Sequence, residues 1–187
     1  MKTKIATYAL IPIILFLIYS LVMSVKGPID EQNRIKKTED AIIAKLKVIR
    51  ELQNSYYAAN NKYAAKWSEL RNFVNQGYFW IIDKRERDLG NGKISLRIDT
   101  LGKVPVKDSL KNLIAGWDIN RIEYIPLNEG NKQFSLYVGK KEISGVKVEV
   151  IEVKDTDPIN PLRKAKNKEK ALRIGSKDEA TLVGNWE

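Results

Sequence analysis

The chain has 187 residues, of which 33 are basic and 23 acidic, giving a formal charge of +10. It contains no cysteine and no histidine, which excludes disulfides, thiolate catalysis, cysteine metal sites and histidine triads. The basic balance favours acidic partners without choosing among nucleic acid, anionic lipid and protein. This composition predicts a protein that is not an enzyme.

The N-terminal segment predicts a membrane span. After a short tail at residues 1–4, residues 5–25 carry no charged side chain, and about 20 such residues cross the hydrocarbon core of a bilayer as a helix. Tyr8 and Tyr19 lie towards its ends, as interfacial aromatic residues do. We interpret the segment as an uncleaved signal anchor. A signal peptide cleaved at Val22-Met23-Ser24 is the alternative.

The flanking charges bear on the orientation of this span. Lys2 and Lys4 favour a cytoplasmic N-terminus, whereas Lys26, Arg34 and the neighbouring lysines oppose it. Because a short basic N-terminus before an apolar run is the usual export signal, we expect a single-pass protein. Its location would be the bacterial inner membrane, with the C-terminal domain in the periplasm.

Residues 29–60 predict a long amphipathic helix that begins after a helix break at Gly27-Pro28. Apolar residues recur along it at spacings of three, four or seven, which places them on one face. The stripe includes Ile42, Leu46, Ile49 and Tyr56. We expect it to pack on the chain's own C-terminal domain, and contact with a partner helix is the alternative.

An aromatic cluster follows this helix. Asn60-Asn61 is predicted to end the helix, because asparagine tolerates the left-handed backbone conformation, and a second short helix is expected over residues 65–76. The aromatic residues around the turn are Tyr56, Tyr57, Tyr63 and Trp67. We expect them to close the core over the joint, and a ligand-stacking site is the alternative.

Residues 61–157 predict an α+β head domain with a small antiparallel sheet of three to five strands. Strands are expected at residues 78–82, 94–100, 121–126, 133–138 and 146–153, with the third and fourth forming a hairpin. The charged run DKRERD at residues 83–88 is expected to be a solvated loop. Asp155-Thr156-Asp157 lacks the rest of a calcium loop and is interpreted as a surface turn. No catalytic, cofactor-binding or metal site is predicted.

Residues 158–187 predict a basic C-terminal tail. Its residues 163–173 hold six basic side chains and one acidic, which favours a solvated connector, with Trp186 docking back on the head. Nucleic acid is not expected, because no aromatic side chains alternate with these charges. The alternative is an anionic lipid surface, contacted through Arg163, Lys164, Lys166, Lys168 and Lys170.

The layout of an apolar N-terminal helix, an amphipathic helix and a small antiparallel sheet resembles type IV pilins and, more closely, type II secretion pseudopilins. The segment IRELQNSYYAANNKYAAKWSEL, residues 49–70, looks like the pseudopilin turn from the long helix to a short one. Residues 5–25 hold neither a glutamate nor the glycine at which a prepilin peptidase cuts. Gly27-Pro28-Ile29, EYIP, GVKVEVIEV and the closing GNWE also resemble a family of uncharacterised single-span bacterial envelope proteins.

The resemblance implies a membrane-anchored, non-enzymatic subunit of a secretion or pilus-type machine, with protein partners or self-assembly. An anchored binding module that captures an exported ligand or polymer at the aromatic corner is the alternative.

Overall fold

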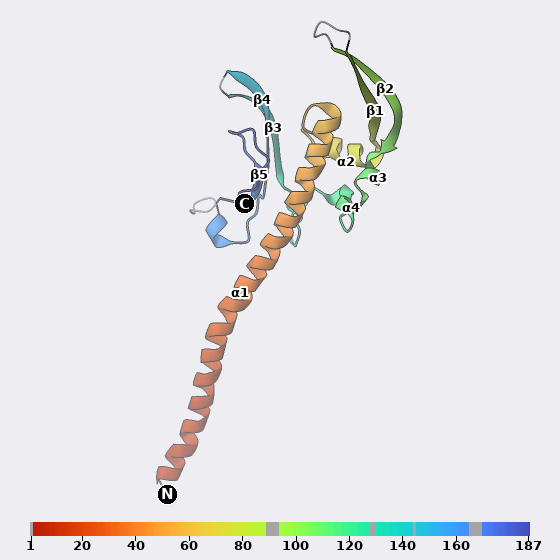
Figure 1. The fold of residues 1–187 in the computed structure, drawn as a ribbon. Helices are drawn as coiled ribbons and strands as arrows, with labels where there is room; N and C mark the ends of the chain where they lie inside the picture. The colour runs from red at the N-terminus through yellow and green to blue at the C-terminus, as the bar shows by residue number, and fades with distance from the viewer. Residues whose placement is uncertain (1, 89–93, 128–129, 144, 165–169) are drawn as a thin grey trace. The chain divides into compact units, whose positions relative to one another are not determined.

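The structure is a computed structural model that describes residues 2–88, 94–127, 130–143, 145–164 and 170–187, with only the backbone for residues 2–11 (Figure 1). It divides into two compact units, Met1–Asp40 and Ala41–Glu187. We describe each by itself and call the second unit the head. A long N-terminal helix and small antiparallel sheets confirm the predicted α+β layout.

Helix α1 runs without interruption from Lys2 to Asn60. The break expected at Gly27-Pro28 is therefore wrong, because both Pro12 and Pro28 lie inside the helix. A proline removes one intrahelical hydrogen bond and crowds the preceding turn. A Cβ added at Gly27 would meet nothing within 4 Å, so packing does not require a glycine before Pro28.

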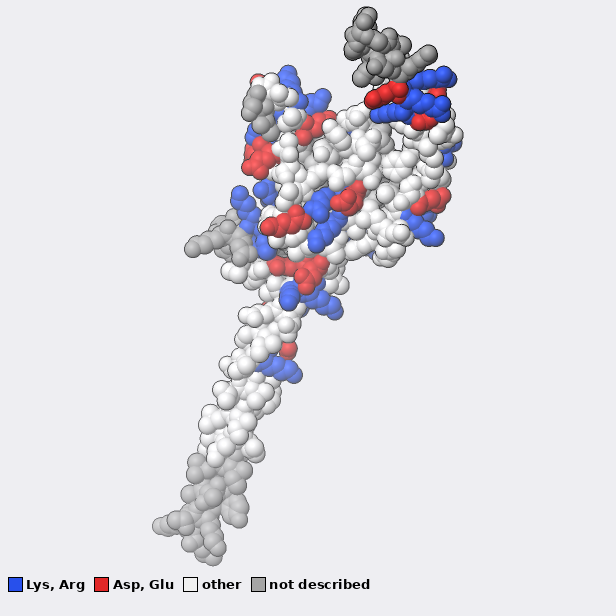
Figure 2. Space-filling view, in the orientation of Figure 1, with Lys and Arg blue, Asp and Glu red and all other residues white. Residues whose placement is uncertain are grey.

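The first unit exposes an uncharged helix surface. Each side chain from Pro12 to Val25 is exposed, and Figure 2 shows this stretch without basic or acidic residues. Within the described part of the chain, α1 is the one helix long and apolar enough to cross a membrane. Further along, Arg34 forms an exposed ion pair with Glu31 at 2.9 Å.

The last five turns of α1, residues 41–60, supply the central wall of the core of the head. Five apolar side chains of this segment are almost fully buried: Ile42, Leu46, Val48, Ile49 and Leu52. They meet buried residues from α2 (Trp67–Gln76), from strands and from the C-terminal segment. The helical period seen in the sequence therefore corresponds to a face that is buried in the chain's own domain.

A three-stranded antiparallel sheet packs on this helix, with strand order β3-β4-β5. Its strands are β3 (Ser135–Ile143), β4 (Val146–Lys154) and β5 (Arg173–Gly175). The predicted hairpin of residues 121–126 and 133–138 is confirmed only near its turn, where Tyr124 bridges to Gln133 in antiparallel orientation. The Ile125 amide donates to the Lys132 carbonyl and the Phe134 amide to the Glu123 carbonyl, both at 2.8 Å. The regular strand β3 begins at Ser135 and pairs with β4. A short helix, η1 (Ile119–Arg121), occupies the start of the hairpin's first segment.

Strands β1 (Tyr78–Asp88) and β2 (Ile94–Pro105) form a separate antiparallel ribbon. The run DKRERD belongs to β1, so the expected loop is wrong. Its charged side chains alternate between the two faces of the strand. On one face Asp83 pairs with Arg85 along β1, and Arg97 pairs with Asp99 along β2. A register shift at Ile81/Ile82 marks a bulge. Beyond β2 come two single-turn helices, α3 (Val106–Ser109) and α4 (Lys111–Ile114).

The C-terminal segment is part of the head rather than a tail. After η2 (Pro161–Arg163), β5 pairs with the end of β4, and Leu172 and Ile174 are buried in the core. Trp186 packs against the same core, as expected. Of the proposed lipid-contacting residues, Lys166 and Lys168 lie outside the described residues. Lys164 and Lys170 are exposed, and Arg163 is half-buried.

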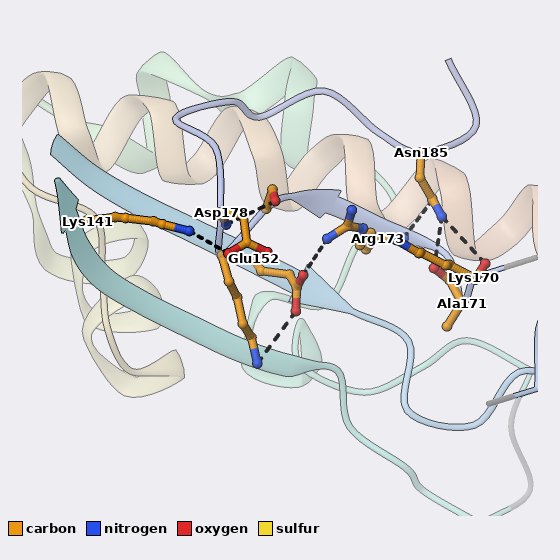
Figure 3. A network of polar contacts seen from close by, with 9 residues as sticks. Lys141, Glu152, Lys170, Ala171, Arg173, Asp178 and Asn185 are labelled. Carbon is orange, nitrogen blue, oxygen red and sulfur yellow. Dashed lines mark hydrogen bonds and ion pairs between the residues drawn. The ribbon is translucent and has the colours of Figure 1, made fainter. Parts of the chain in front are cut away.

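A polar network fixes this segment to the sheet (Figure 3). The Arg173 guanidinium donates to the buried Glu152 carboxylate at 2.6 Å, and Lys141 of β3 reaches Asp178 at 2.6 Å. The Asn185 side chain accepts from the Arg173 amide and donates to the Ala171 carbonyl, both at 3.0 Å. These bonds satisfy backbone groups at the start of the short strand β5.

Candidate binding sites

The predicted site residues differ in burial: four are buried, two are half-buried and one is exposed. Ile42, Leu46, Ile49 and Tyr56 are core residues of the head. Tyr63 and Trp67 are half-buried and pack against that core. Tyr57 differs from the expectation that it closes the core, because 41% of its surface is exposed.

Tyr57 and Tyr63 form one wall of a pocket at the corner after α1. Their ring centroids lie 4.7 Å apart with the planes tilted by 37°. The turn between them depends on Asn61, whose φ of 53° is left-handed, as predicted. The corner pocket, which these rings share with Asn61, Lys140, Lys147, Glu149 and Thr181, has a volume of about 560 Å³.

The opposite wall comes from the β3–β4 hairpin, which is far away in the sequence. In the register, Lys140 lies opposite Glu149 and Lys147 lies opposite Glu142, so these four side chains share one face of the hairpin. Further along the same face, Ile151 and Val153 are core residues. The pocket therefore lies where the core-facing side of the sheet extends past the core.

The charged side chains that line the corner pocket are Glu149, which is hydrogen-bonded, and the lysines Lys140 and Lys147. Glu149 accepts a hydrogen bond from the Tyr63 backbone amide at 3.1 Å. Burial, with Tyr57 and Glu149 adding to it, raises the pKa of the Tyr63 phenol above its ordinary 10.0. The phenol therefore stays neutral at neutral pH. Among the described residues, neither Lys140 nor Lys147 has an ion-pair partner.

The ribbon presents a second candidate surface. Residues at alternate positions of a strand share a face, as do residues directly opposite each other. On one face the register gathers five exposed apolar side chains, Tyr78, Trp80, Ile82, Leu96 and Ile98. Three charged residues share this face, with Lys103 opposite Trp80, Glu86 opposite Leu96 and Lys84 opposite Ile98. We call this the apolar ribbon face. The other face carries the ion pairs of Asp83 with Arg85 and of Arg97 with Asp99.

A buried lysine links α1 to the segment after η1. Lys45 donates to the carbonyl oxygens of Arg121 at 2.8 Å and Tyr124 at 2.6 Å. Nearby, the buried Glu123 pairs with Arg71. Burial lowers the pKa of Lys45, and the Arg121 charge adds to this effect, while Glu123 and Asp118 oppose it. Lys45 therefore has a structural role, because its two hydrogen bonds hold α1 against this segment. It also lines a pocket of about 450 Å³.

We expect replacement of Lys45 by methionine to change how stability depends on pH. Because folding lowers this pKa below 10.5, the folded chain releases the proton first as the pH rises, and the unfolded state then binds more protons. The difference in the free energy of unfolding, wild type minus variant, should increase as the pH approaches 10.5. The same difference should decrease again as the pH is lowered through the pKa that Lys45 has in the folded chain.

Urea unfolding of the detergent-solubilised chain, from neutral pH to pH 10.5, measures this difference. The exposed neighbour Lys47, replaced by methionine, serves as the control and should show no such trend. A difference between wild type and the Lys45 variant that stays constant with pH would contradict the lowered pKa.

The acidic turn after β4 does not form a metal site in the part of the chain that the structure describes. Asp155 is buried and accepts from the Asp157 amide at 2.9 Å, which is a local side-chain turn. This turn borders a pocket of about 590 Å³ that Arg163, Lys164 and Lys177 also line. Negatively charged carboxylates and positively charged lysine and arginine side chains both line this pocket, so it favours neither anions nor cations.

Two buried polar residues of α1 are not among the predicted site residues. Gln53 is fully buried, and its amide exchanges hydrogen bonds with the backbone of Ala64, at 3.0 Å and 3.1 Å. Lys45 is the other. Both lie at core positions of the helical period, and a polar residue at such a position is the signal for a buried hydrogen bond.

No family model, curated protein or solved structure matches this chain.

Proposed function

We propose that this chain is a membrane-anchored, non-enzymatic subunit of a bacterial envelope assembly, pseudopilin-like in its layout. The first unit would anchor it in the inner membrane, and the head would lie in the periplasm and join other copies of the chain. The observation that carries the anchor is the uncharged, exposed surface of residues 12–25. Burying such a surface in lipid is favourable, and leaving it in water is not.

The apolar ribbon face supports the assembly part of the proposal. Trp80 is 66% exposed and Ile98 is 54% exposed, and a two-stranded ribbon is marginally stable by itself in water. Exposed apolar side chains that gather on one face beside polar ones favour an interaction site. Contact with a neighbouring subunit would remove this surface from water.

The absence of cysteine gives a direct test, because a single introduced cysteine reports one position. We expect Ile98→Cys to form disulfide-linked dimers of the full chain when membranes are oxidised. The matched control is Arg97→Cys, which lies one residue away on the opposite face. It should cross-link far less.

Two outcomes would count against the proposal in different ways. Release of the wild-type chain from membranes by alkaline carbonate would exclude the anchor. Equal cross-linking at positions 97 and 98 in retained protein would leave the anchor but exclude the apolar ribbon face as the contact.

A further inference from the structure

We propose that the corner pocket binds a saccharide that carries an acidic group. The site is formed from the end of α1, the β3–β4 hairpin and the C-terminal segment, and it does not depend on the anchor or on the apolar ribbon face. Its volume of about 560 Å³ is within the range of small-molecule sites, roughly 300–1,000 Å³.

The aromatic wall provides the stacking surface. The Tyr57 ring is 41% exposed, although it is held in place by contact with Tyr63 at 4.7 Å between centroids. The face of an aromatic ring carries partial negative charge. The C–H groups on one side of a sugar ring carry partial positive charge and pack well on such a face. A ring that is fixed before binding loses little conformational entropy when the ligand arrives.

The polar wall determines which saccharide fits. Lys140 and Lys147 are point charges suited to a carboxylate or a phosphate. Glu149, the acid that lines the pocket with them, already accepts the Tyr63 amide. Glu142 lies opposite Lys147 in the register but does not line the pocket. Asn61, Thr181 and the neutral Tyr63 hydroxyl can exchange hydrogen bonds with sugar hydroxyls.

Calorimetric titration of the full chain in detergent micelles tests the proposal. The probes are a galacturonic acid oligomer, the matching neutral galactose oligomer and inorganic phosphate. We expect saturable binding of the acidic oligomer that weakens as salt is added. The neutral oligomer should bind more weakly, and inorganic phosphate alone should not bind measurably.

Variants locate the binding. Tyr57→Ala should raise the Kd for the acidic oligomer about tenfold, while Tyr57→Phe should keep most of the affinity. The matched control is Tyr137→Ala, because Tyr137 is 40% exposed and lies on the other face of the same hairpin. Lys147→Gln should reduce the preference for the acidic over the neutral oligomer.

Three results would overturn the proposal: no saturable binding of the acidic oligomer, equal binding of phosphate alone, or equal effects of Tyr57→Ala and Tyr137→Ala. Circular dichroism of each variant shows whether the head is still folded. Because the pocket is independent of subunit contact, loss of the Ile98→Cys cross-link would leave this binding unchanged.

Discussion

Deleting residues 171–187 should unfold the head. The deletion removes β5 and four side chains that lie in or against the core: Leu172, Ile174, Leu182 and Trp186. Truncating one buried leucine or isoleucine to alanine costs about 2–5 kcal/mol, and small domains have a total stability of only about 5–15 kcal/mol. The shortened chain should be degraded by a protease that leaves the full chain intact.

Point variants separate loss of packing from loss of chain length. Ile174 is fully buried, so Ile174→Ala should lower the free energy of unfolding by about 2–5 kcal/mol. Val183 lies in the same segment but is 55% exposed, so Val183→Ala should change it by less than about 0.5 kcal/mol. Tryptophan fluorescence during urea unfolding measures both, since all four tryptophans lie in the head. Equal stability of the two variants would contradict the packing of β5.

The C-terminal segment shows how composition can hide a strand. Residues 163–173 are so rich in lysine and arginine that they resemble a solvated connector. The short apolar run at Ala171-Leu172 and Ile174 was the available signal. It is too short to be recognised without knowing that the edge of β4 lies beside it.

Local patterns predicted the helices better than the strand pairing. The period of Ile42, Leu46 and Ile49 identified a buried helix face, because that pattern depends only on neighbouring turns. Residues 123–125 meet residues 132–134 over a few backbone bonds only, whereas the long pairing of β3 with β4 depends on competition among segments. In β1, the charges of DKRERD masked a strand of a ribbon whose ion pairs form along each strand.

The corner pocket could be predicted only in part. The sequence placed Tyr57 and Tyr63 together, because one turn separates them and Asn61 adopts the left-handed conformation there. The lysines of the opposite wall are about 80 residues further along the chain. No local pattern brings them to the corner, since their position follows from how the sheet packs on α1.

Gln53→Ala should destabilise the head strongly although it removes no charge. The Gln53 amide is fully buried, and it donates to the Ala64 carbonyl at 3.1 Å and accepts from the Ala64 amide at 3.0 Å. Ala64 is fully buried too. The variant would leave two backbone groups without partners and open a cavity. A buried group without a hydrogen bond costs about 1–3 kcal/mol, so we expect a loss of about 2–5 kcal/mol in urea unfolding.

Three further variants isolate the hydrogen bonds from the volume. Gln53→Leu fills the space but bonds to neither group, so it should remain clearly less stable than the wild type. Gln53→Glu keeps an acceptor for the Ala64 amide and loses the donor to its carbonyl. Asn54→Ala, at the exposed neighbouring position, should have little effect. If Gln53→Leu unfolds at the same urea concentration as the wild type, shape rather than hydrogen bonding holds the turn after α1. The corner pocket should then survive without the amide.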